Sequence, residues 1–176
     1  MKLRFLLLLF YFSFFLAFSQ KKSFPQAWEG IWKGELSIYN AKGTQMQLPM
    51  ELHILPLDSA KWTWKIVYAP KDKPKDERPY ELIIKDKAKG HYAIDEKDGI
   101  VLDAFYMGEH FFSTFAVQGT EITAIEHLEG KNLILEMIAS NSKELNITGG
   151  TSEEVPPVSS FATTSYHKAV LKRVKK

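Results

Sequence analysis

The chain has 176 residues, of which 45% are hydrophobic, with 23 Lys and Arg against 21 Asp and Glu and no cysteine. The lack of cysteine excludes a disulfide framework, a thiolate metal ligand and a cysteine nucleophile. The near balance of charge argues against nucleic acid or an anionic membrane as the main partner, because both select for clustered positive charge.

The first 19 residues have the pattern of a signal peptide. Lys2 and Arg4 form a short basic start, an apolar run follows up to Phe18, and small residues flank Phe18 at the positions that a signal peptidase reads. We expect cleavage before Gln20 and export to the periplasm or the outside of the cell, with no integral membrane span in the mature chain. An uncleaved anchor is the alternative. Residues 20–176 would then form a single, formally neutral domain.

From residue 28 onward apolar and polar side chains alternate. Every second residue is apolar in 28–38, 46–54, 61–68 and 80–85, which is typical of antiparallel strands with one buried face. Short turn sequences such as AKGT, DKAKG and EKDG separate these segments. The pattern predicts about ten strands and no amphipathic helix. Residues 140–160 are expected to be irregular before a last strand near 161–174.

Three two-residue loops predict the register of the later strands. A loop at Gly108-Glu109 pairs Tyr106 with Phe111, one at Gln118-Gly119 pairs His110 with His127, and one at Glu129-Gly130 pairs Glu126 with Leu133. One nearly all-apolar face results. A meander of this length either splits into a sandwich or closes, and closure removes the exposed edges. We therefore predict an all-β, antiparallel up-and-down β-barrel of about ten strands.

The segment GIWKGEL, residues 30–36, carries a family resemblance. Gly30, Trp32 and Gly34 project to one side, so that two missing side chains leave room for the indole. This pattern resembles the Gly-x-Trp signature on the first strand of calycins, which include lipocalins, fatty-acid-binding proteins and nitrobindin-like proteins. The resemblance implies a calycin-like barrel in which a basic residue of the last strand packs across Trp32. Arg173 is placed for this role, and such a stack contributes roughly 0.5–2 kcal/mol.

About ten strands without a helical lid look more like nitrobindin than like fatty-acid-binding proteins. Nitrobindins hold haem through a histidine near the start of the last strand, where this chain has Tyr166 and His167. Alignment on the downstream Lys-Arg-Val places Tyr166 at the ligand position, and a one-residue offset turns a strand side chain to the other face. Tyrosine also binds ferric haem. Haem on Tyr166 or His167 is thus one alternative, and otherwise we expect no cofactor.

Aromatic side chains and one acid are the candidates for a ligand pocket. They would form an aromatic chamber for an apolar or planar ligand, or simply fill the core. Glu126 is the one carboxylate on the inner face of the later strands. If Glu126 is buried, its pKa would rise and its carboxyl could contact a cationic or hydroxylated group of a ligand. If it lies at the barrel rim, it is in water. The candidates are Trp28, Trp62, Trp64, Tyr68, Tyr80, Tyr106, Phe111, Phe115, Glu126 and Tyr166.

Metal and catalytic signals are weak. His110 and His127 would lie opposite each other on the outer face, close enough to share a metal, or they form a solvated surface pair. No G-x-S-x-G elbow, H-E-x-x-H motif or glycine-rich phosphate loop is present. We therefore expect an exported, non-enzymatic protein that binds a small, largely apolar ligand in a barrel cavity. A packed structural or interaction module without a ligand and a nitrobindin-like haem protein are the alternatives.

Overall fold

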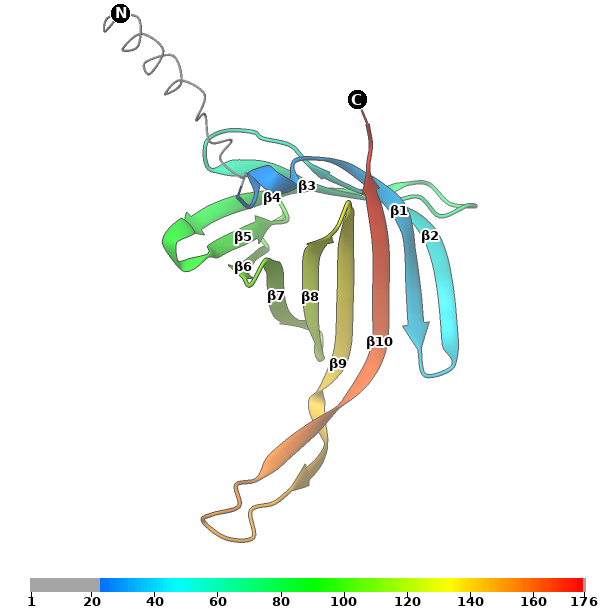
Figure 1. Ribbon diagram of the computed structural model, residues 1–176. Helices are drawn as coiled ribbons and strands as arrows, with labels where there is room; N and C mark the ends of the chain where they lie inside the picture. Colours follow the sequence, from blue (N-terminus) through cyan, green and yellow to red (C-terminus); the bar gives the residue numbers. More distant parts are fainter. Residues whose placement is uncertain (1–22, 176) are drawn as a thin grey trace, which may run out of the picture.

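The computed structural model describes residues 23–175, which form ten antiparallel strands closed into one barrel (Figure 1). Consecutive strands pair throughout, and β1 completes the ring with β10, which confirms the predicted all-β up-and-down barrel. The predicted signal peptide, residues 1–19, lies outside the described residues. The strands are β1 (Gly30–Asn40), β2 (Gly43–Ile54), β3 (Lys61–Tyr68), β4 (Asp76–Asp86), β5 (His91–Asp95), β6 (Val101–Met107), β7 (His110–Val117), β8 (Thr120–Glu129), β9 (Asn132–Thr148) and β10 (Val158–Arg173).

The first and last strands meet through one cation and one indole. Trp32 of β1 lies opposite Arg173 of β10, and the guanidinium carbon of Arg173 is 4.4 Å from the centre of the indole ring. The same guanidinium donates a hydrogen bond from Nη2 to the carbonyl of Ala27 at 2.7 Å. The Trp32 side chain is 2% exposed, and its Nε1 donates to the carbonyl of Trp28. Arg173 therefore ties β10 both to β1 and to the segment before it.

The glycines beside Trp32 make room for β10 rather than for the indole. A Cβ on Gly34 would lie 2.2 Å from the carbonyl oxygen of Val170, which is closer than any carbon–oxygen contact allows. A Cβ on Gly30 would lie 3.1 Å from the side chain of Arg173, and Gly30 has a φ of +147°. The sequence-based explanation, that the missing side chains accommodate the indole, is corrected here: they let the closing strand approach.

Aromatic side chains close the barrel at the end where Trp32 and Arg173 meet. The 3-10 helix η2 (Gln26–Trp28) buries Trp28, and Phe24 just before it is 3% exposed. The Phe24 ring stacks on Tyr106, with centroids 4.5 Å apart, and lies 5.0 Å from the ring of Phe111. The segment before β1 thus enters the barrel and fills this end. No described helix is long and apolar enough to cross a membrane.

The hairpin registers were predicted with one error. Tyr106 faces Phe111 and His110 faces His127, as expected. Glu126, however, pairs with Leu135 and not with Leu133. The two-residue loop is Gly130-Lys131, one position later than the predicted Glu129-Gly130, and this shifts the pairing by two residues. A shift of two keeps every side chain on its predicted face, because side chains alternate with period two.

A two-stranded arm replaces the irregular segment predicted for residues 140–160. The far parts of β9 and β10 leave the barrel together and pair as far as Thr148 and Val158 (Figure 1). Register shifts between Ser160 and Ser165 mark the point where the arm departs. Its polar sequence lacks the alternation of a half-buried strand, since neither face is covered. Backbone pairing alone defines these strands, and Leu145 is 70% exposed.

Replacing Gly34 with alanine tests the closure. We expect Gly34→Ala to lower the free energy of unfolding by about 3 kcal/mol, because β10 must move away from the added methyl group. Urea unfolding measures this loss. Glu35→Ala, at the next and exposed position of β1, is the control and should change stability by less than about 0.5 kcal/mol. Equal stability of the two variants would contradict the close approach.

Candidate functional site

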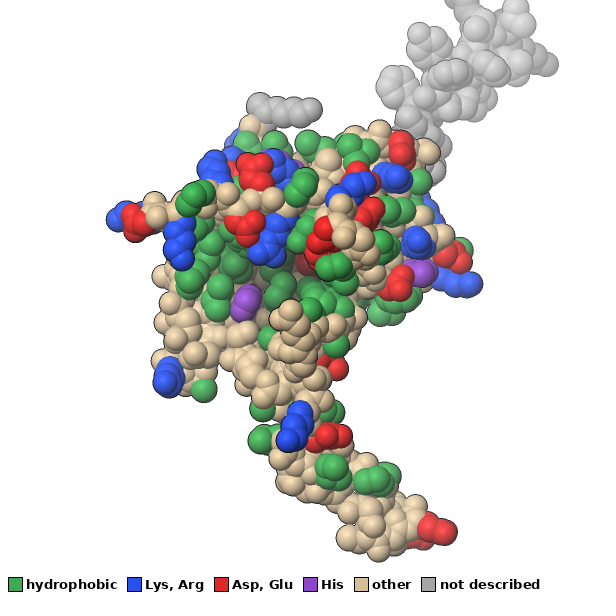
Figure 2. Space-filling model, turned by 180° about the vertical axis from the view of Figure 1, so that it is seen from behind, with side chains coloured by type: hydrophobic (Ala, Val, Ile, Leu, Met, Phe, Trp, Pro, Cys, Tyr) green, Lys and Arg blue, Asp and Glu red, His purple; other side chains and the backbone are tan. Residues whose placement is uncertain are grey.

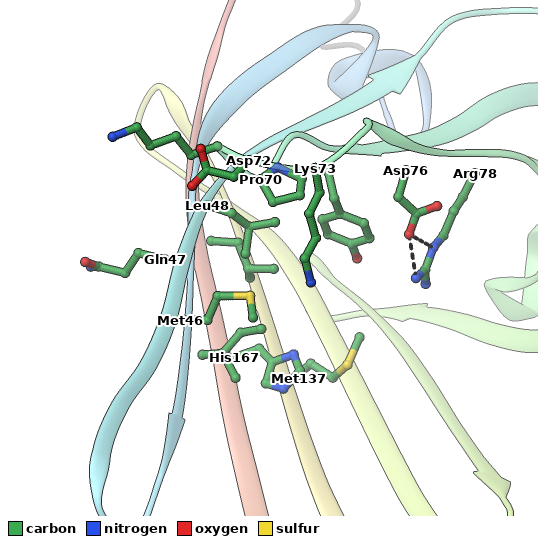
Figure 3. A pocket seen from close by; sticks show the side chains of 14 residues that line it. Met46, Gln47, Leu48, Pro70, Asp72, Lys73, Asp76, Arg78, Met137 and His167 are labelled. Carbon is green, nitrogen blue, oxygen red and sulfur yellow. Dashed lines mark hydrogen bonds and ion pairs between the residues drawn. The ribbon is translucent and has the colours of Figure 1, made fainter.

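A cavity of about 530 Å³ opens into the barrel, away from the end that Phe24 and Trp28 fill. Figure 2 shows a hollow lined mainly by hydrophobic side chains, with charged side chains gathered along one side of it. Figure 3 shows the cavity from close by, with Met46 and Leu48 from β2 facing His167 from β10 and Met137 from β9. The lining residues are Leu36, Ile38, Met46, Gln47, Leu48, Tyr68, Pro70, Lys71, Asp72, Lys73, Asp76, Arg78, Met137 and His167.

The cavity forms because only part of β2 pairs with β3. β2 pairs with β1 along its whole length, but with β3 only from Met50 to His53. β3 ends at Tyr68, and the chain then runs through residues 69–75 to β4. The part of β2 that carries Met46 and Leu48 therefore has a neighbour on one side only, and the barrel wall opens beside it.

Charged groups lie at one side of this opening. The guanidinium carbon of Arg78 is 5.0 Å from the centre of the Tyr68 ring. Nε and Nη2 of Arg78 donate to Oδ2 of Asp76 at 3.2 and 3.0 Å, so Arg78 is held over the phenol. Burial raises the pKa of Tyr68, which keeps the phenol neutral. The site thus combines aliphatic and methionine side chains with one phenol, one imidazole and a group of charged side chains at the opening.

The last strand presents His167 to the cavity, not Tyr166. His167 lines the cavity, and burial lowers the pKa of its imidazole. Tyr166 lies on the outer face, where its hydroxyl donates to Oε1 of Glu136 and its ring stacks on Tyr39 at 5.9 Å. The placement of Tyr166 in the pocket is therefore corrected. Alternation from Arg173, which faces inward, passes through Leu171, Ala169 and His167, so the sequence contained this signal.

Glu126 is buried inside the barrel. Its side chain is 5% exposed, and it is the only buried acid among the described residues. It lies in register between Phe111 and Leu135, two apolar neighbours, and its Oε2 has no hydrogen-bond partner in the described part of the chain. Burial raises the pKa of Glu126 to about 8, so the carboxyl is mostly protonated at pH 7. Of the two predicted locations, the rim in water is excluded.

Most of the aromatic candidates fill the core instead of lining the cavity. Trp62 and Trp64 are 2% and 3% exposed; Trp62 donates from Nε1 to Oε1 of Glu29, and the Trp64 ring lies 5.2 Å from that of Phe111. Tyr106 stacks on Phe24, and the half-buried Phe115 does not line the cavity. Among the predicted aromatic pocket residues, Tyr68 alone does so.

The two outer-face histidines contact each other. The rings of His110 and His127 are 4.5 Å apart, and Nδ1 of His110 lies 2.8 Å from the carbonyl oxygen of Gly108. Within residues 23–175 no group of three or more His, Cys, Asp or Glu side chains is placed to hold a metal ion. The pair is therefore a ring contact on the outside of the barrel.

Sequence reasoning missed Arg78 and Asp76. Both belong to the stretch PKDKPKDER, residues 70–78, whose prolines and charges are typical of a turn. The signal that identifies them is alternation, since Arg78 and Asp76 lie two and four residues before the inward-facing Tyr80 on β4. Charged side chains are tolerated on this inner face because the barrel is open to water at this end.

Comparison with known proteins shows the fold and no family. No protein-family model matches the sequence, and no curated protein matches it either. Among solved structures, the S-type phycobiliprotein lyase CPES from Guillardia theta superposes with a TM-score of 0.56. The two share 8% sequence identity over 84% of this chain and 89% of the other. The barrel has the calycin-like fold that the resemblance of GIWKGEL implied.

The buried carboxyl gives stability a specific pH dependence. The pKa of Glu126 is raised on folding, so its favourable protonated form is fully present below about pH 4.5 and is lost as the pH rises through about 8. Relative to Glu126→Gln, the protein should lose roughly 3–5 kcal/mol of unfolding free energy between pH 4.5 and pH 9. Urea unfolding of both proteins across this range measures the difference, and a constant difference would contradict the burial.

Proposed function

We propose that the protein is exported and that its barrel binds a small, largely apolar molecule in the cavity beside β2. The cavity carries this proposal: about 530 Å³ lies within the usual size range of small-molecule sites. Its strands contribute aliphatic and methionine side chains, and Tyr68 and Arg78 add a few polar groups that can orient a ligand. Export rests on the sequence of residues 1–19 alone.

We further propose that the protein binds its ligand without chemistry. The similar structure belongs to a protein named a lyase, so the fold alone does not argue against an enzyme. The support comes from the cavity itself. Two of the charged groups at the opening, Asp76 and Arg78, are hydrogen-bonded to each other, and the sequence contains no G-x-S-x-G, H-E-x-x-H or glycine-rich phosphate-loop motif. The alternative, a barrel whose interior is solidly packed, fits only the end that Phe24 and Trp28 fill.

An uncharged hydrocarbon probe tests the binding proposal. Diphenylhexatriene should become fluorescent with the purified protein, and Met46→Glu should weaken its binding about tenfold, because the new carboxylate places charge beside the apolar walls. Leu145→Glu on the exposed arm makes the same change in charge outside the cavity and is the matched control. Equal affinity of the two variants, or no binding by the unmodified protein, would contradict the proposal.

Haem binding is a second candidate, supported by the position of His167. The imidazole faces the cavity, its lowered pKa makes it a neutral nitrogen donor at pH 7, and its Nε2 is 3.2 Å from Oγ of Ser165. A haem bound here would supply an iron centre, and His167 would be its protein ligand. Tyr166 is turned to the outer face and is not placed for this role.

Hemin titration distinguishes the haem candidate. A Soret band that appears with the unmodified protein, persists in Tyr166→Phe and is lost in His167→Ala would establish ligation by His167. Tyr166→Phe is a suitable control because it alters only the neighbouring, outward-facing side chain. If all three proteins give the spectrum of free hemin, the haem candidate is wrong.

A further inference from the structure

The buried acid of β8 has no structural partner that explains it. An ionised carboxyl in an apolar interior is strongly destabilising, and even a neutral one is unfavourable while its oxygens lack hydrogen bonds. Glu126 lies between Phe111 and Leu135, and its Oε2 has no hydrogen-bond partner among residues 23–175. A glutamine or an apolar residue would be less costly here for stability alone. The position is therefore better explained by a ligand than by folding.

Glu126 lies one step along the barrel wall from the cavity. Met137 of β9 lines the cavity, Leu135 lies two residues from it on the same face, and Leu135 pairs directly with Glu126. Arg78 covers the Tyr68 ring from the opening and is itself held by Asp76. Arg78 and Asp76 therefore mark the opening, and Met137 and then Leu135 lead from the cavity to Glu126. Glu126 does not line the cavity as it stands and lies one step deeper.

The other titratable groups of the interior do not neutralise Glu126. The flanking strands present Phe111, Ser113, Leu135 and Met137, none of which carries charge. His167 lines the same cavity from β10, but burial lowers its pKa and keeps it neutral at pH 7. The phenols of Tyr80, Tyr92 and Tyr106 have raised pKa values and stay neutral too. Among residues 23–175 no cation pairs with Glu126, so a ligand can supply one.

We propose that Glu126 anchors the ligand, and that the ligand class is an apolar molecule with an amine head that enters the barrel head first. This rests on the proposed binding function and specifies its ligand. An ammonium group that reaches Glu126 takes the place of the missing partner and forms a charge-assisted hydrogen bond in a dry site. A fatty acid would bring a second carboxyl to the same place; the two groups could share one proton but would keep an unpaired negative charge in the apolar interior. The barrel therefore prefers amines to carboxylic acids of equal length.

Binding of the amine releases a proton. In the free protein the carboxyl of Glu126 is mostly protonated at pH 7. The incoming ammonium stabilises the carboxylate, so the O–H bond of Glu126 breaks, the proton passes to the buffer, and the N⁺–H···O⁻ pair remains. A long-chain amine is protonated at pH 7, since its own pKa lies near 10. Close to one proton should leave for each amine bound at pH 7, and the number should fall to nearly zero at pH 9, where Glu126 is already mostly ionised.

Displacement of diphenylhexatriene by matched amphiphiles tests the selectivity. Decylamine, decanol and decanoate have the same alkyl chain and are used below their micelle concentrations. We expect decylamine to displace the probe from the unmodified protein at a concentration at least about tenfold lower than decanoate. In Glu126→Gln, which is nearly isosteric, this preference should disappear while decanol and the probe bind as before. The cations at the opening, Lys71, Lys73 and Arg78, favour the acid in both proteins, so the comparison corrects for them.

Calorimetry of the unmodified protein gives an independent test without a variant. The heat of decylamine binding, measured at pH 7 in buffers with different ionisation enthalpies, yields the number of protons released. Close to one proton supports the proposal, and no release overturns it. Probe binding with equal displacement by decylamine and decanoate, or a preference that survives in Glu126→Gln, would overturn this proposal and leave the binding function standing. No probe binding at all would overturn both.

Discussion

The close contact between the first and last strands is the constraint on which the structure depends. Gly34 lets the carbonyl of Val170 approach to a distance that no side chain would permit, and Arg173 reaches back across Trp32 to the carbonyl of Ala27. Without this contact β1 and β10 would be two free edges, and the apolar face of the sheet would be open to water. Closure creates an interior, and every later feature of the site lies on that interior.

The interior is filled at one end and hollow at the other because different parts of the chain meet there. Phe24 and Trp28 enter the barrel ahead of β1 and pack on Tyr106 and Phe111. At the other end the wall parts where β2 extends beyond β3, and the space is lined by aliphatic and methionine side chains. The aromatic residues therefore stabilise the barrel, and the hollow is formed by the unequal lengths of neighbouring strands.

Glu126 lies at the boundary between these two halves. The packed side surrounds it with Phe111 and Leu135, and on the open side Met137, which lines the cavity, lies two residues beyond Leu135 on the same face. A carboxyl in this position reduces stability, and groups with strongly shifted pKa values gather at functional sites for this reason. A barrel that must only be stable would place an apolar residue here. The location of the acid thus supports the proposal that the adjoining cavity binds a ligand.

Local alternation in the sequence determined which residues face inward, because neighbouring strand side chains point to opposite faces whatever surrounds them. The inward position of Glu126 follows from that rule, whereas the pairing of His110 with His127 follows from the two-residue loop at Gln118-Gly119. Applied from Arg173, alternation would also have identified His167 in place of Tyr166. Depth along the barrel is different, since it depends on which distant strands cover a residue. Only the tertiary structure decided that Glu126 is buried, that the tryptophans are core and that the cavity opens beside β2.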